Sequence, residues 1–159
     1  MIDNTYLIKA IDAYPYNLPE AVEALNYALS YDGENVFALQ LMAKIYAEQL
    51  KDYHNAMIYF EAAMQADMSQ PSLYPDYINI AIKVADYLNA QKLIEFALTL
   101  RGTNKALIYS LQAYLYESLF KYKKAIKAIK KAKKFAFDQH TTNCLIDAEK
   151  RIEDKMSQK

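Results

Sequence analysis

The feature that most constrains the fold is a double series of alanines with a nearly constant period. One series recurs at intervals of 35, 34 and 35 residues, at Ala28, Ala63, Ala97 and Ala132. A second series lies seven residues ahead with the same intervals, at Ala21, Ala56, Ala90 and Ala125. Four positions after each leading alanine stands a larger apolar residue: Leu25, Phe60, Ile94 and Ile129. A period of this length indicates one structural unit that is repeated four times.

Each unit contains two segments with the apolar spacing of a helix. The second helices are expected at residues 19–31, 53–66, 87–100 and 121–135, and the first helices at 36–49, 73–85 and 106–119, with a less regular one near 3–14. Alanine lets a neighbouring helix backbone approach closely, and the bulky residue one turn away fills the adjacent groove. Since the linkers between segments are short, the helices of each pair should pack antiparallel.

The repeat pattern resembles that of the tetratricopeptide repeat family, in which bulky, small and aromatic residues alternate at set positions. The second unit matches it at Leu39, Met42, Ala43, Tyr46, Tyr53, Ala56, Phe60 and Ala63. The third matches at Tyr74, Tyr77, Ile78, Ala81, Tyr87, Ala90, Ile94 and Ala97, and the fourth at Tyr109, Gln112, Ala113, Tyr116, Tyr122, Ala125, Ile129 and Ala132. The first unit shows only its second helix clearly.

The resemblance implies an all-α fold, a right-handed α-solenoid of antiparallel helix pairs with about three and a half repeats. We expect a single domain over residues 1–159, with units at 1–34, 35–69, 70–103 and 104–137. Residues 138–157 break the pattern, since Leu145, Ala148, Ile152 and Met156 form one narrow apolar stripe in an otherwise polar segment. This segment is expected to be a capping helix with one face on the last repeat and the other in water.

Little in the sequence supports catalysis. His54 and His140 lie far apart, and neither has partners at metal-ligand spacing, so both are expected to be solvated turn residues. Cys144 has no basic helix neighbour or nearby histidine, so we expect a buried or half-buried thiol and not a nucleophile. Two glycines cannot build a phosphate-binding loop. We therefore predict a protein that is not an enzyme and uses no cofactor and no metal.

The expected location is the cytoplasm. The N-terminal residues carry Asp3 and Asp12 and lack the basic leader and apolar core of a secretory signal. No apolar run approaches the length of a membrane span. A single cysteine fits a reducing compartment.

The family resemblance also implies a binding surface. Tetratricopeptide arrays bind extended or helical peptides on the concave surface lined by their first helices. At positions that usually point inward, the candidate contacts are Phe37, Gln40, Lys44, Glu48, Asn79, Lys83, Ser110, Tyr114 and Glu117. Members that grip a C-terminal carboxylate use amide and cationic donors at set positions, where this sequence has Gln40, Lys44, Asp76, Leu107 and Leu111. Because Asp76 would repel a carboxylate and the leucines cannot donate, that specific function is not expected.

The strongest departure from a neutral surface is a basic run over residues 121–134, which holds eight lysines and no acid. Its candidate patch consists of Lys121, Lys123, Lys124, Lys127, Lys130, Lys131 and Lys134. Like charges at helical spacing and cations in a first turn disfavour the helix. One interpretation is a solvated face that acids of the capping helix partly neutralise. The alternative is a site for a polyanion, either nucleic acid, an acidic protein segment or an anionic lipid surface.

The charge is also divided along the chain. Residues 1–100 carry five lysines against thirteen acids, a balance of −8, while residues 101–159 carry fourteen Lys and Arg against six acids, a balance of +8. A third hypothesis is therefore weak head-to-tail self-association between the acidic half of one copy and the basic half of the next. The favoured prediction remains a partner protein, of unknown identity, bound in the groove of the first helices.

Overall fold

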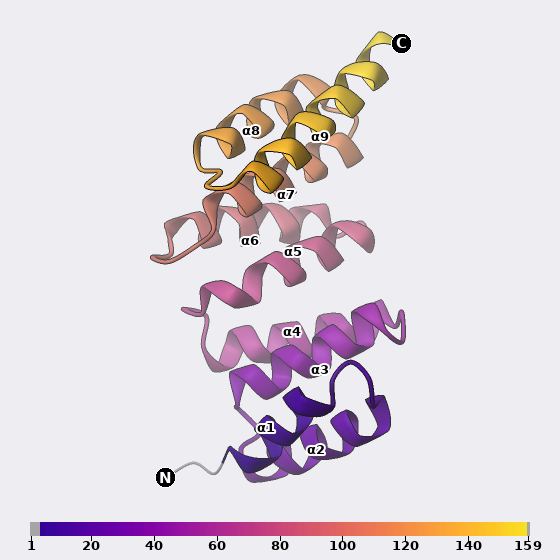
Figure 1. The fold of residues 1–159 in the computed structure, drawn as a ribbon, viewed down its shortest axis with the longest axis vertical. Coiled ribbons are helices and arrows are strands. Elements are labelled where there is room, and N and C mark those ends of the chain that lie inside the picture. Colours follow the sequence, from indigo (N-terminus) through magenta and orange to yellow (C-terminus); the bar gives the residue numbers. More distant parts are fainter. Residues whose placement is uncertain (1–3, 159) are drawn as a thin grey trace. The chain divides into compact units, whose positions relative to one another are not determined.

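The computed structural model describes residues 4–158, which are helical with no strand among them. The chain divides into two compact units, Met1–Leu73 and Tyr74–Lys159. Each unit is built from helices that follow one another through short connections (Figure 1). The prediction of a single domain with four repeat boundaries stays a prediction.

The first unit contains two helix pairs. Helices α1 (Thr5–Ala13) and α2 (Leu18–Tyr31) form one pair, and α3 (Val36–Glu48) and α4 (Tyr53–Ala66) form the other, followed by a short 3₁₀ helix, η1 (Pro71–Leu73). Its core cluster joins α1, α2 and α3 through buried Leu7, Leu25, Met42 and Ile45. These helices lie within one or two residues of the bounds expected from the sequence.

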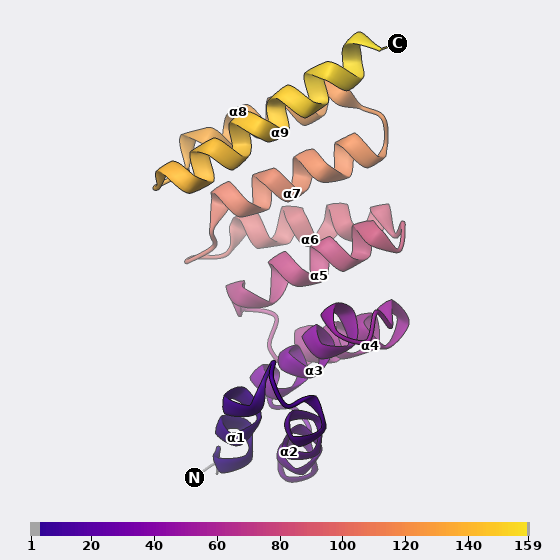
Figure 2. The same cartoon turned by 45° about the vertical axis from the view of Figure 1, so that its right-hand side comes forward.

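The second unit contains five helices. Helices α5 (Tyr74–Lys83) and α6 (Tyr87–Thr99) pair, α7 (Lys105–Ser118) pairs with α8 (Tyr122–Lys134), and α9 (Gln139–Ser157) packs beside α8 (Figure 2). Ile129 on α8 and Leu145 and Ile152 on α9 share one buried cluster. The position of α9 confirms the expected helix over 138–157, which covers the last repeat.

The two alanine series lie in the buried core, as their spacing predicts. All eight alanines are buried, and Leu25, Phe60, Ile94 and Ile129 are at most 1% exposed. Of the eight tyrosines at repeat positions, Tyr74 and Tyr77 are buried and the other six are half-buried. Packing therefore accounts for these aromatic residues at least in part.

Most helices of both units begin at an asparagine or aspartate. The side chains that accept a backbone N–H in this way are Asn17, Asn35, Asp52, Asp86, Asn104 and Asp138. Such caps satisfy amides that the first turn leaves unpaired. At Asp52 the side chain and backbone amides of Asn55 donate to the carboxylate, which lowers its pKa. Helix α8 differs, because Lys121 stands at its N-cap and makes no such bond.

None of the helices within residues 4–158 is both long and apolar enough to cross a bilayer.

Candidate functional site

A pocket of about 430 Å³ lies between α7 and α9 in the second unit. Its apolar walls come from Leu107 and Leu111 on α7, Ile129 on α8, and Leu145 and Ile152 on α9. Its polar lining consists of Asn104, Ser110, Tyr114, Glu117, His140, Thr141, Cys144 and Arg151. A volume of this size, with apolar walls and a few polar groups, is typical of ligand sites.

Two capped helix starts position the walls of the pocket. Asn104 accepts the amide of Leu107 at 3.1 Å and begins α7. Asp138 accepts the amide of Thr141 at 2.7 Å and its hydroxyl at 3.0 Å, and begins α9. These bonds lower the pKa of Asp138. Since residues three and four apart share a helix face, Leu107, Ser110, Leu111 and Tyr114 form one wall along α7.

Glu117 forms a salt bridge with Arg151 in the lining of the pocket. The residue is 8% exposed, and its carboxylate accepts two hydrogen bonds from Arg151, at 3.2 and 3.0 Å, and one from Lys155 at 2.6 Å. Burial raises the pKa of Glu117, but the bonds and charges of the two cations outweigh burial and bring the pKa below its ordinary value. The carboxylate that was a candidate partner contact is therefore already bound to α9.

Cys144 differs from the expectation for this residue. The thiol is exposed, and its sulfur lies 3.8 Å from Nε2 of His140. The expectation of a buried or half-buried thiol without a nearby histidine is wrong, because residues four apart on a helix lie on the same face. Within residues 4–158 no third side chain is hydrogen-bonded to His140 to orient the ring. His54 and His140 are both exposed, as expected, but they lie in the first turns of α4 and α9 and not in the connections between helices.

The remaining groove candidates fall into two sets. On α3 in the first unit, Phe37 is 54% exposed, Gln40 donates to the carbonyl of Ser72 at 3.0 Å, Lys44 is half-buried, and Glu48 accepts from the Tyr14 hydroxyl at 2.9 Å. In the second unit, Asn79 and Lys83 lie on α5 and do not line the pocket. Ser110, Tyr114 and Glu117 are the candidates that the structure brings together there.

The pocket's second wall was missed by sequence reasoning. The side chains of His140, Thr141, Cys144 and Arg151 belong to the helix expected only to cap the array. His140, Cys144 and Arg151 stand at i, i+4 and i+11, so the sequence could have shown that these three share a face, but nothing in it places that face against α7.

The lysines of α8 lie apart from the pocket. Lys121, Lys123, Lys124, Lys127, Lys130, Lys131 and Lys134 are all exposed. Lys133 pairs with Glu149 on α9 at 2.7 Å, which is the one ion pair of α8 within the described part of the chain. Lys124 and Lys131 also lie over the rings of Tyr116 and Tyr109. The capping helix thus neutralises one lysine of eight by direct contact.

Among residues 4–158 no group of three or more His, Cys, Asp or Glu side chains is arranged to hold a metal ion.

Comparison with known proteins shows the fold. No family model and no curated protein matches the sequence. MamA 41-end from Desulfovibrio magneticus RS-1 superposes with a TM-score of 0.71 at 19% identity, over 96% of this chain and 90% of that one. A thermophilic tetratricopeptide repeat protein of Thermus thermophilus superposes with a TM-score of 0.72 at 16% identity, over 90% of this chain and 78% of that one. The chain has the all-helical tetratricopeptide repeat fold, as its repeat pattern predicted.

Proposed function

We propose that this chain is a non-catalytic interaction module that binds a segment of a partner protein along its first helices. The pocket between α7 and α9 is the anchor of that surface and receives one large apolar side chain of the segment. The observation that carries the proposal is the pocket itself, a hollow of about 430 Å³ at the positions of Ser110, Tyr114 and Glu117. A repeat array supplies surfaces of this kind and leaves chemistry to other proteins.

The lining indicates what the pocket prefers. Leu107 and Leu111 stand where a carboxylate clamp would need donors, and Leu107 is 40% exposed beside the pocket. Burial of these leucines against an apolar side chain would be favourable at about 25 cal/mol for each Å² removed from water. Arg151 also lines the pocket, and the one carboxylate of Glu117 pairs both with Arg151 and with Lys155, which lies outside the lining. The surplus cation favours a segment with an acidic residue next to its apolar anchor.

Selection from a library of random peptides displayed on phage tests the proposal with the full chain as bait. The selected peptides should contain a large apolar residue with an acidic neighbour. Their affinity for Tyr114→Ala should fall about tenfold, since an aromatic contact at the centre of an interface contributes more than 1 kcal/mol. Tyr16→Ala is the matched control, because Tyr16 is 95% exposed on the first unit and lies outside the pocket.

Cys144 gives an independent measurement of the same contact. Its thiol lines the pocket and is exposed, so a bound peptide should slow its reaction with a maleimide. Peptides that bind Tyr114→Ala as tightly as the original chain, and leave the labelling rate unchanged, would place partner binding elsewhere and refute the proposed site.

A further inference from the structure

The feature that the proposed function does not use is the outer face of α8. Lys123, Lys127, Lys130 and Lys134 follow one another at i, i+4, i+7 and i+11, so they form a single row, the lysine ridge. The row is about 16 Å long at the rise of an α-helix. All four side chains are exposed, and the buried residues of α8 (Ala125, Ala128, Ile129 and Ala132) occupy the opposite face. Nothing on α8 itself offsets this charge.

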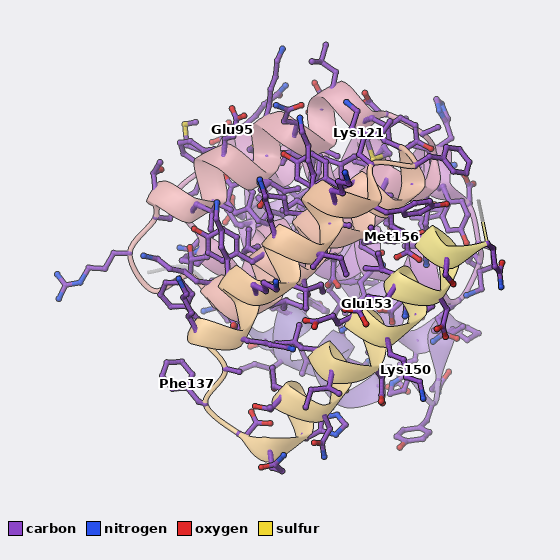
Figure 3. All side chains as sticks on the ribbon, turned by 90° about the horizontal axis from the view of Figure 1, so that it is seen from above. Glu95, Lys121, Phe137, Lys150, Glu153 and Met156 are labelled. Carbon is purple, nitrogen blue, oxygen red and sulfur yellow. The ribbon has the colours of Figure 1, made fainter. Side chains whose placement is uncertain are left out.

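An exposed phenylalanine stands at each end of the ridge. Phe120 directly precedes the N-cap of α8 and is 70% exposed, and its ring makes an edge contact with that of Tyr122. Phe137 lies in the connection between α8 and α9 and is 95% exposed. Figure 3 shows Phe137 beyond one end of α8 and Lys121 at the other. Exposure of such large apolar side chains to water is unfavourable and indicates an interaction site.

Comparison among the repeats shows that the fold does not require these residues. The turns before α4, α6 and α8 each have a residue with positive φ, which is Lys51 (54°), Ala85 (63°) and Phe120 (59°) respectively. The next residue is the N-cap, and it is Asp52, Asp86 and then Lys121. A bulky aromatic is strained at positive φ, and lysine neither caps the helix nor suits its positive end. The fourth unit therefore gives up local stability at two adjacent surface positions.

The other second helices carry acids that α8 lacks. Glu20 and Glu23 lie on α2, Glu61 on α4 and Glu95 on α6. Good helix formation alone would be satisfied by a mixture of glutamate and lysine. The composition of α8 is thus a departure from the repeat in charge as well as in its cap.

We propose that the lysine ridge, with Phe120 and Phe137, docks the protein on the surface of a bilayer that contains anionic lipid. Lysine ammonium groups suit the diffuse charge of a lipid surface, whereas recognition of nucleic acid favours arginine and its paired donors. No arginine lies on α8. The phenylalanines stand at the two ends of the row of lysines, and exposed rings of this kind enter the interface between headgroups and acyl chains. Stacking of nucleic-acid bases would instead need exposed rings along the ridge, whereas Tyr109 and Tyr116 are half-buried under Lys131 and Lys124.

Sedimentation with sucrose-loaded vesicles tests the proposal. The full chain should bind phosphatidylcholine vesicles that contain roughly 30% phosphatidylserine, bind vesicles of phosphatidylcholine alone far less, and be released as salt rises. The double variant Lys127→Gln with Lys130→Gln should lower the partition coefficient about 25-fold, since each lysine near an anionic surface contributes about fivefold. The control pair Lys9→Gln with Lys150→Gln makes the same charge change at exposed lysines of α1 and α9 and should change it less than about twofold.

A second pair of variants tests the aromatic contribution. Phe137→Ser should lower binding to the anionic vesicles about tenfold, because the variant lacks the phenyl group whose transfer from water into the bilayer favours binding. Tyr16→Ser removes an equally exposed ring, 95% in both cases, and should have no effect. All four substituted lysines and both rings are exposed, so circular dichroism should show unchanged helix content.

Three results would overturn the proposal. An equal fall of the partition coefficient in the two double lysine variants would show that net charge alone drives binding. Equal binding to vesicles with and without phosphatidylserine would show that anionic lipid is not the partner. Binding of a single-stranded or double-stranded oligonucleotide that Lys127→Gln with Lys130→Gln abolishes, without binding to anionic vesicles, would make α8 a nucleic-acid site. Tyr114→Ala should bind vesicles normally, which separates this inference from the proposed peptide site.

Discussion

Replacement of Glu117 tests how the capping helix is held. Its carboxylate is the one buried charged group among the described residues, and it binds α9 to α7 across 34 positions of sequence through Arg151. The variant Glu117→Gln keeps the size of the side chain and removes its charge. Three hydrogen bonds from charged donors are weakened together, two from Arg151 and one from Lys155.

The magnitude follows from the exposure of the partners. A hydrogen bond to a charged group contributes about 1.5–3 kcal/mol, and an exposed ion pair about 0.2–1 kcal/mol. The side chains of Arg151 and Lys155 are 55% and 45% exposed, so both cations regain water when the carboxylate is removed. Each of the three contacts should therefore contribute an amount close to that of an exposed ion pair. Together they should stabilise the packing of α9 on α7 by about 2 kcal/mol.

Amide hydrogen exchange measures this effect where it should appear. Terminal elements of repeat proteins open locally, so protection in α9 should fall about 30-fold in Glu117→Gln while α6 changes little. Glu153→Gln, on the exposed side of the same helix, should leave protection within about twofold. If α9 is protected equally well in Glu117→Gln and in the Glu153→Gln control, the contact of Glu117 does not hold α9 on α7, and the reasoning is refuted.

Lowering the pH should reduce the hydrogen-exchange protection of α9 in the original protein as well. Because the pKa of Glu117 is lowered by folding, its contribution is present above the ordinary carboxyl pKa of about 4.3 and is lost as pH falls through the lowered value. Hydrogen-exchange protection of α9 should therefore fall as the pH is lowered. In Glu117→Gln this fall should be smaller, because the contribution of the carboxylate is already absent. An identical pH dependence in the two proteins would contradict this account.

Three further results are expected. Ala97→Leu should destabilise the chain by about 1–3 kcal/mol in urea, because Ala97 is fully buried and a larger side chain must displace its neighbours; unchanged stability would mean that the alanine series is not a packing requirement. Asn104→Ala should cost about 1 kcal/mol through loss of the cap of α7, and a value near zero would show that the bond to Leu107 is not formed in solution. Cys144 should react with a thiol reagent in the native protein, and a need for denaturant would contradict its exposure.

The helices could be predicted because their signals are local. Alanine and a bulky neighbour at helical spacing recur in every unit, and each repeat packs mainly on the units next to it in sequence. The second helices were therefore placed to within a residue or so, as at α4 (Tyr53–Ala66) and α8 (Tyr122–Lys134). The first helix of the third unit was less accurate, since η1 (Pro71–Leu73) precedes α5 and a residue of positive φ, Ala85, follows it.

The candidate site was only half predictable. Family positions indicated Ser110, Tyr114 and Glu117 on α7, and these do line one pocket. The contact between Glu117 and Arg151, and the exposure of Cys144 beside His140, were not foreseen. Because His140 and Cys144 are four residues apart on a helix, their spacing in the sequence places them on one face.

What the sequence alone determined is the repeat, its helices and the charge on each helix face, because spacing along one chain defines which residues share a face. Tertiary structure decided which faces meet. The rotation of α9 about its own axis is set by burial of Leu145 and Ile152 against α8, and that rotation carries Arg151 to Glu117 while it leaves the lysine ridge uncovered. Such a rotation depends on the fit between side chains distant in sequence, for which no local pattern exists.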